Sequence, residues 1–375
     1  MTPADPIAAV THPDPYPYYR TLAQSRPFHF DAALKLWVAA SAGAVAEVLE
    51  HPDARVRPPA QPVPPALAGS AAGDLFGRLV RMNDGAGHAP LKSILMRRLA
   101  ALDLSAVDER ARAVASGLPR MTADDAHEAM RWMFTLPVLT MADLLGLPLE
   151  RDVQGHVTTR VAGFVATFAT AMSPLATLAD VEAGVAAAQW LTRCAQDRLP
   201  DAPADSLLHA LARDAAAADI DPASLVANAV GLMVQACEAT AGLVGNTLVW
   251  LGRQPQRSGD IDVAVSHVAH IDPPVQNTRR FMAADAVLCG QPVKAGDAVL
   301  VLLAAAAHDP AGAAVPARPW TFGAGRHGCP GDALAQVLAA CTVQALLERD
   351  VRPERLVCDR VRYRPSVNVR MPQFS

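Results

Sequence analysis

A single cysteine, Cys329, lies in the glycine-rich stretch FGAGRHGCPG, residues 322–331. An apolar face follows at helical spacing, formed by Leu334, Val337, Leu338 and Cys341. A thiol at a helix N-terminus meets the positive end of the helix dipole and unpaired backbone amides, and both favour the thiolate. Because a thiolate is a good ligand for a soft metal centre, this position predicts a metal ligand.

The glycines around Cys329 suit the close approach of a flat ligand. The residues free to adopt positive φ are Gly323, Gly325, Gly328 and Gly331. Pro330 suits the first turn of the helix that follows. The competing interpretation is a buried structural thiol in a glycine-rich turn, which is the commoner role of an isolated cysteine. The spacing of the whole stretch favours the ligand.

The spacing is that of a known heme-binding signature, F-G-x-G-x-H-x-C-x-G. The matching residues are Phe322, Gly323, Gly325, His327, Cys329 and Gly331. The chain therefore resembles the cytochrome P450 family, and the resemblance extends over nearly its full length. It implies the P450 fold, mainly α with small β-sheets, as a single domain over residues 1–375.

The resemblance implies one heme b (protoporphyrin IX iron) with Cys329 as the metal ligand. Electron donation from the thiolate would favour O–O cleavage, and the amides of Gly325 and Gly331 would tune the sulfur. The anionic propionates would need cationic partners. Four residues match positions that supply them: His327, Arg280, His88 and Lys92.

His88 and Lys92 stand where members usually carry H-x-x-x-R. A solvated helix start is the competing interpretation, because such a pair is common on helix surfaces. Lysine in place of arginine weakens bidentate pairing but keeps the charge.

Residues 231–246 look like the long helix that crosses above the heme in this family. The usual A-G-x-E/D-T-T is replaced by Gln235-Ala236-Cys237-Glu238-Ala239-Thr240. In the family the acid and the following alcohol relay protons, so Glu238 keeps the acid while Ala239 removes the alcohol. Thr240 acting through water, a substrate hydroxyl, or chemistry that bypasses oxygen activation could compensate. Glu238 could also be an ordinary surface carboxylate.

Gln235 lies on the same helical face as Glu238 and Ala239, because the spacing is i, i+3, i+4. The resemblance then places a bulky amide close to the iron. Such an amide would narrow the oxygen cleft, or would hydrogen-bond a bound diatomic molecule or a polar substrate.

The family's E-x-x-R brace is missing. His267, Val268, Ala269 and His270 stand at its position, and the shortened segment between Asp309 and Phe322 keeps Arg318 as its only arginine. Two histidines without further ligands favour a structural or exposed role over a metal site. We expect the brace to be absent or rebuilt, which bears on heme retention and partner docking.

Composition excludes several classes. The 375 residues carry a net charge of −4 with 19% charged residues, which gives no basic footprint for nucleic acid. Six cysteines without a CxxC pair indicate a reducing compartment. A proline-rich, acidic N-terminus and the lack of a long uncharged span predict no secretion signal and no membrane segment, hence a cytoplasmic protein.

Apolar periodicity predicts a mostly helical chain, with helices over residues 42–50, 107–118, 126–146, 180–199 and 206–217. Strands are expected over 34–40, over 279–293 as a pair turning at Gly290 and Gln291, and over 362–371. Five prolines in residues 57–69 predict an extended, non-helical path, either a surface loop or a lid.

The function that the resemblance implies is oxidation of a small organic metabolite, either apolar or polyketide-like or peptide-like, by a heme-thiolate monooxygenase using dioxygen. Electrons would come from a separate ferredoxin and ferredoxin reductase. Two alternatives stay open: a heme-thiolate enzyme of another type (peroxide-dependent oxidation, dehydration, isomerisation or nitrogen-oxide chemistry), and a non-catalytic heme-binding homologue.

Overall fold

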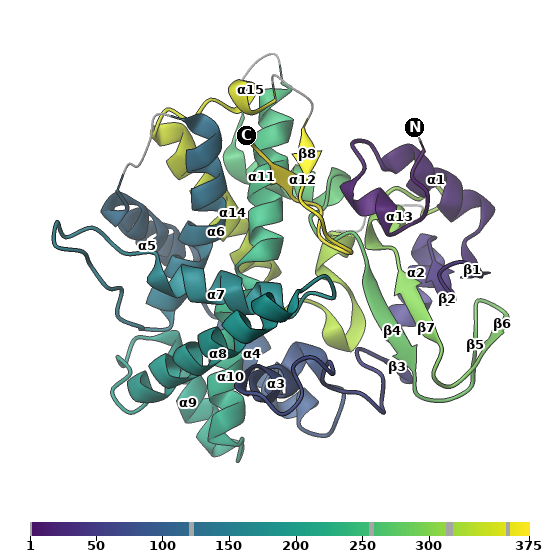
Figure 1. Cartoon of the computed structure of the whole chain (residues 1–375), viewed down its shortest axis with the longest axis horizontal. Helices are drawn as coiled ribbons and strands as arrows, with labels where there is room; N and C mark the ends of the chain where they lie inside the picture. Colours follow the sequence, from purple (N-terminus) through teal and green to yellow (C-terminus); the bar gives the residue numbers. More distant parts are fainter. Residues whose placement is uncertain (1, 120–123, 255–258, 313–317, 358–360) are drawn as a thin grey trace. The chain divides into compact units, whose positions relative to one another are not determined.

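The computed structural model describes residues 2–119, 124–254, 259–312, 318–357 and 361–375 (Figure 1). The chain divides into two compact units. Unit 1 holds residues 1–62, 266–329 and 360–373, and unit 2 holds residues 63–265, 330–359 and 374–375. The single domain expected from the sequence stays a prediction.

Unit 1 is built on a five-stranded sheet of order β1-β2-β7-β4-β3. Strands β2 and β7 are parallel, and every other neighbouring pair is antiparallel. The strands are β1 (Phe28–Asp31), β2 (Leu36–Ala39), β3 (Ala54–Arg55), β4 (Thr278–Met282) and β7 (Ala298–Val301). Two small antiparallel pairs join β5 (Ala286–Leu288) to β6 (Gln291–Val293) and β8 (Arg362–Tyr363) to β9 (Pro372–Gln373).

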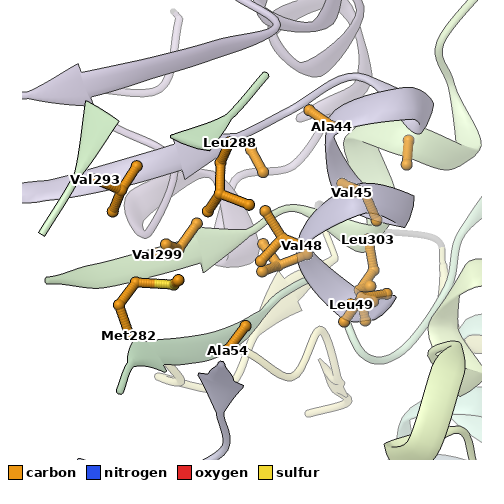
Figure 2. Close-up of a cluster of buried hydrophobic side chains, with 13 residues drawn as sticks. Ala44, Val45, Val48, Leu49, Ala54, Met282, Leu288, Val293, Val299 and Leu303 are labelled. Atoms are coloured by element: carbon orange, nitrogen blue, oxygen red, sulfur yellow. The ribbon is translucent and has the colours of Figure 1, made fainter. Parts of the chain in front are cut away.

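Alternate residues of this sheet enter two cores, as the period of a strand requires. On one face Val299 and Val301 pack with helix α2 (Ala42–Glu50), whose Val45, Val48 and Leu49 are buried (Figure 2). On the other face Leu300 and Leu302 pack with α1 (Tyr16–Ser25) and α13 (Leu303–Ala307). Three 3-10 turns complete the unit: η1 (Ala8–Thr11), η3 (Trp320–Phe322) and η4 (Gly325–His327).

Unit 2 is helical. Its helices are α3 (Ala71–Arg78), α4 (His88–Ala100), α5 (Leu104–Gly117), α6 (Asp125–Leu144), α7 (Arg160–Ala171), α8 (Leu178–Arg198), α9 (Leu207–Ala217), α10 (Pro222–Gln235), α11 (Glu238–Gly252), α14 (Asp332–Glu348) and α15 (Pro353–Leu356), with one 3-10 turn, η2 (Val80–Met82). Helix α12 (Ile261–Ile271) contributes its first residues to unit 2 and its last to unit 1. The centre of unit 2 is apolar, with Trp132, Met133 and Leu136 of α6 buried.

The expected helices are confirmed within one to three residues, and the mainly α fold with small sheets is confirmed as well. The first residues of the range 279–293 form β4 of the large sheet, whereas the predicted strand pair within this range is confirmed as the hairpin of β5 and β6. Its turn lies at Cys289 and Gly290, one residue earlier than predicted, and both have positive φ. Residues 362–371 form a strand only at Arg362–Tyr363.

The proline-rich segment over 57–69 contains no helix, as predicted. The predicted extended path is wrong at its end, where Leu67 and Ala68 donate to the carbonyl of Pro64 in consecutive turns. Leu67 is buried, which explains why the chain folds back there.

Two helical stretches, Pro222–Gly252 and Gly325–Glu348, are long and apolar enough to cross a membrane by length and composition alone. Core helices of water-soluble proteins pass the same test, and 83% of the apolar window in the first stretch is buried inside the protein. The two stretches are weak evidence for a membrane protein.

One carboxylate links the helix that carries His88 to its neighbour. Asp214 of α9 accepts from Arg97 Nη2 and Arg98 Nε of α4, each at 2.8 Å. These arginines lower the pKa of Asp214 well below its ordinary value. A depressed carboxyl pKa contributes stability above the unfolded-state pKa of about 4 and loses it as the pH falls through the folded-state pKa.

We predict that Asp214→Asn lowers the free energy of unfolding by about 1 kcal/mol at neutral pH. The difference from wild type should shrink progressively below about pH 4, where the carboxyl group of the unfolded chain becomes protonated while that of the folded protein is still ionised. Urea unfolding followed by circular dichroism across this range measures both. Asp205→Asn, which removes an exposed carboxylate paired to Arg110 at 3.2 Å, is the control and should change little. A pH-independent difference would contradict the assignment.

Candidate functional site

The segment around Cys329 is closed by its own backbone. The amide of Cys329 donates to the carbonyl of Phe322 at 2.8 Å, and that of Gly323 donates to Trp320 at 2.8 Å. The amide of Gly328 donates to the carbonyl of Gly325 at 3.0 Å. Turns η3 and η4 thus hold Cys329 at the end of a compact loop, in which the cysteine is partly buried.

Two of the four glycines need their conformational freedom. Gly323 and Gly325 have φ of +65° and +63°. A Cβ on Gly325 would lie 2.7 Å from the carbonyl oxygen of Leu49, so the loop rests on the last turn of α2. The prediction of positive φ is wrong for Gly328 and Gly331, because their φ values are −54° and −124°.

Pro330 does not begin the helix after Cys329. Helix α14 starts at Asp332 with Gly331 as its N-cap, so Pro330 lies one residue before the cap. The prediction for Pro330 is wrong because the non-helical Gly331, with ψ of 35°, delays the start. Cys329 precedes the first helical residue by three positions, and the loop rather than the helix positions it.

Two arginines attach the Cys329 loop to unit 1. Arg326 donates to the carbonyls of His51 at 3.0 Å and Ala54 at 2.7 Å, which ties the loop to the end of α2 and the start of β3. Arg318 donates from Nη2 to the carbonyl of Cys329 itself and from Nη1 to that of Gly323 at 3.5 Å. The sequence identified Arg318 only as the last arginine of a shortened segment.

The other predicted heme-binding residues of unit 1 lie on the sheet and the loop. Arg280 is on β4, only 4% exposed, and donates to the carbonyl of Arg279 at 2.9 Å. His327 ends η4 and is partly buried, as is Phe322 at the end of η3. A buried guanidinium and a half-buried imidazole are groups that pair with anions.

The two predicted cationic residues of unit 2 lie at the start of α4. His88 is the first helical residue and only 7% exposed, and Lys92 lies one turn later, partly buried. The i, i+4 spacing places both on one face. The burial of His88 argues against a solvated helix start.

The predicted long helix over residues 231–246 is broken, so a continuous helix is wrong. Helix α10 ends at Gln235 and α11 begins at Glu238, because Cys237 has a non-helical ψ of −89°. Gln235, Glu238 and Ala239 are nevertheless the partly exposed residues of a buried segment. They flank the break, and each is partly exposed.

The side chains at the break have distinct surroundings. Gln235 donates from Nε2 to the carbonyl of Gly231 at 3.1 Å, so its amide is oriented along α10. Thr240 is 2% exposed within α11, whereas Glu238 is accessible. Arg81, which the sequence interpretation missed, contributes an opposite charge to the surroundings of Glu238. Nothing in the local sequence around Arg81 signals that proximity.

His267 and His270 of α12 stand at the position expected for the E-x-x-R brace. His267 is exposed, and burial together with His267 lowers the pKa of the partly buried His270. Among the described residues no cluster of three His, Cys, Asp or Glu side chains could hold a metal. Unit 1 instead buries Arg370, 1% exposed, whose Nε donates to Asp272 at 2.8 Å.

The Arg370 guanidinium lies over the ring of Tyr363, with Cζ at 3.5 Å from the ring centroid, and donates to the carbonyl of His12 at 2.6 Å. Asp272 also accepts a hydrogen bond from Tyr16. Arg370 and Asp272 therefore join segments near both ends of the chain to the end of α12. Asp272 directly follows Ile271, the last residue of that helix.

The structure groups the predicted residues in two sets. Unit 1 holds Arg280, Phe322, Gly323, Gly325, His327 and Cys329. Unit 2 holds His88, Lys92, Gln235, Glu238, Thr240 and Gly331.

Comparisons with known proteins agree on one family. No family model matches the chain. It is 27% identical to the cytochrome P450 monooxygenase PikC of Streptomyces venezuelae over 306 residues, covering 73% of this chain and 71% of PikC. It is 28% identical to cytochrome P450 140 of Mycobacterium tuberculosis over 249 residues, 59% of this chain. That match spans 55% of the relative, about half of its length.

A solved structure supports the same conclusion at the level of the fold. The complex of P450BioI with an acyl carrier protein ligated to hexadec-9Z-enoic acid matches with a TM-score of 0.75 and 20% identity, covering 96% of this chain and 97% of that one. The chain is thus similar to cytochrome P450s in sequence and in fold. This similarity implies a heme b cofactor.

The residues of unit 1 fit that group. Heme b needs an axial ligand and partners for its carboxylates, and unit 1 offers a loop thiol at Cys329 and a buried guanidinium at Arg280. The glycine at position 325 removes the side chain that would otherwise collide with α2.

We predict that Gly325→Ala costs about 2 kcal/mol of folding free energy, because it combines positive-φ strain with the contact to Leu49. Gly290→Ala is the matched control: Gly290 has φ of +75° but open space around its Cβ position, so its cost should be about 1 kcal/mol. Chemical unfolding of both variants measures the difference. Equal costs would show that the packing on α2 contributes nothing.

We predict that Arg318→Ala destabilises the Cys329 loop by about 1 to 3 kcal/mol, because two carbonyls lose a guanidinium donor. The ferrous carbon monoxide complex should then lose its thiolate-type absorption band faster on standing. Arg362→Ala, on the exposed position of β8, is the control. Equal rates in both variants would contradict a role for Arg318 in holding the cysteine.

Proposed function

We propose that this P450 is a heme-thiolate monooxygenase that oxidises a small organic metabolite with dioxygen. The observation that carries the proposal is Cys329 at the end of a closed loop whose six signature residues are complete. The similarity to PikC, a P450 named as a monooxygenase, supports it.

Cys329 would supply the iron ligand, and Arg280, His327, His88 and Lys92 would neutralise the propionates. When bound, heme supplies the activation of dioxygen. Phe322, Gly323, Gly325 and Gly331 would form the loop that receives it. Arg318 would hold the cysteine carbonyl and place a positive charge near the thiolate, which lowers the energy of the anionic sulfur.

Glu238 would deliver protons on the substrate side. It is accessible at the first turn of α11, and a carboxyl can pass a proton through water to the site of reaction. Ala239 provides no hydroxyl beside it, and Thr240 is buried. Ordered water or a substrate hydroxyl therefore has to complete the relay, and Gln235 would position either one by hydrogen bonding.

A second candidate is a heme-thiolate enzyme that does not activate dioxygen by this route, such as a peroxide-dependent oxidase. Two observations favour it: the missing alcohol at Ala239 and the break between α10 and α11 at Cys237. Hydrogen peroxide is dioxygen already reduced by two electrons and carrying two protons. The chemistry therefore needs less proton delivery from the protein.

The remaining assignments follow from the family. A small molecule is the substrate, a ferredoxin with its reductase is the electron source, and the cytoplasm is the compartment. The absence of a basic footprint in the composition supports a protein that does not act on nucleic acid.

Reduction of the purified protein under carbon monoxide tests the thiolate assignment. Wild type should give the red-shifted absorption band of a thiolate-ligated heme, and Cys329→Ser should lose it. Product formation from a panel of metabolites, with ferredoxin and reductase in one arm and peroxide alone in the other, then separates the two candidates. Turnover only with peroxide would reject the monooxygenase.

A further inference from the structure

Arg81 lies in a turn that unit 2 holds firmly. The turn η2 follows α3, and the amide of Val80 donates to Asn228 Oδ1 of α10 at 2.8 Å. Asn228 Nδ2 returns a hydrogen bond to the carbonyl of Arg78 at 2.8 Å. Asn83 donates to the carbonyls of Gly77 and Leu79 at 2.7 and 2.8 Å. The backbone of Arg81 is therefore fixed on both sides.

The same turn is pressed against α10 close to its break. A Cβ on Gly231 would lie 2.7 Å from Leu79 Cδ2, so the end of the Leu79 side chain packs directly on α10 at this glycine. Gly231 is one helical turn before Gln235, the last residue of α10. This packing brings the turn with Arg81 to the surface that also carries Gln235 and Glu238.

Arg81 is charged but has no partner on this surface. Within the described parts of the chain it makes no hydrogen bond and no ion pair, and its Nε atom is buried. Burial lowers the pKa of Arg81, while the nearby Glu238 acts in the opposite direction. Glu238 is thus close enough to affect the pKa of Arg81, yet the two side chains form no ion pair.

Other arginines in unit 2 form ion pairs with carboxylates. Arg78, three residues earlier, pairs with Asp221, and both Arg97 and Arg98 pair with Asp214. A partly buried cation without a partner is costly, so proteins seldom keep one without a ligand. A planar guanidinium is shaped to receive a carboxylate through two parallel hydrogen bonds.

We propose that Arg81 binds the carboxylate of the substrate, so that the substrates of this enzyme are amphipathic organic acids. The proposal rests on the function proposed above and adds its substrate class. The apolar part of the acid would lie along Ala239 and the break at Cys237, where the small side chain of Ala239 leaves room beside Glu238. The two acidic groups, Glu238 and the substrate, would then lie on opposite sides of one arginine.

Binding of a matched pair of probes tests the proposal. Decanoate and 1-decanol have the same chain and differ in charge, and isothermal titration calorimetry of the heme-loaded protein gives both dissociation constants. Wild type should bind decanoate at least about tenfold more tightly, because a charge-assisted bidentate pair forms only with the acid. Failure of wild type to prefer decanoate would overturn the proposal.

Variants assign the preference to one side chain. Arg81→Met should remove it, and Arg81→Lys should keep part of it because the charge remains while the fork is lost. Arg78→Met is the matched control: it lies on the same segment and is paired with Asp221, so the preference should be unchanged. A preference that survives Arg81→Met would overturn the proposal, as would equal losses in both methionine variants.

Arg81 could bind a heme propionate in place of a substrate carboxylate. The rate of heme transfer to apomyoglobin distinguishes these two ligands. If Arg81→Met accelerates heme loss and leaves the decanoate preference intact, the arginine binds a propionate and the proposal fails. Calorimetry needs no turnover, so the result is independent of the function test. A missing thiolate band would reject the monooxygenase, whereas a missing decanoate preference would reject only the role of Arg81.

Discussion

The attachment of the Cys329 loop to the end of α2 is the contact on which the rest of the candidate site depends. Gly325 lets the loop backbone reach the carbonyl of Leu49, and Arg326 bonds to the carbonyls of His51 and Ala54 just beyond it. Helix α2 is in turn fixed by its apolar face on the sheet (Figure 2). The position of the thiol is thus set by a rigid core rather than by the loop alone.

Two arginines make contacts in unit 1, where His267 and His270 stand at the position expected for the E-x-x-R brace of cytochrome P450s. Arg318 takes the carbonyl of Cys329 directly, and Arg370 with Asp272 forms a buried pair at the end of α12. Replacing all partners of a buried ion network can be nearly neutral, because no charge is left uncompensated. Of the two histidines at that position, His267 is exposed and His270 is partly buried.

The surface around the break between α10 and α11 combines charged and polar groups. An acid, an amide and an arginine are present at Glu238, Gln235 and Arg81, while the hydroxyl expected beside the acid is missing. Such a surface is richer in charge than an apolar metabolite requires. A charged substrate would offset that cost by supplying the anion that Arg81 lacks.

The sequence by itself indicated the similarity to cytochrome P450s, the cysteine proposed as the iron ligand and the mainly helical fold, because a fixed spacing of glycines, histidine and cysteine and a helical apolar period are local properties. It also identified Glu238 without its alcohol. Only the tertiary structure decided that α10 and α11 are separate helices and that β4 joins the large sheet. It also decided the partners of three arginines: Arg318 donates to the carbonyl of Cys329, Arg326 donates to that of Ala54, and Arg81 lies near Glu238. Those outcomes depend on packing between segments distant in the chain, such as Leu79 against Gly231, which no local pattern records.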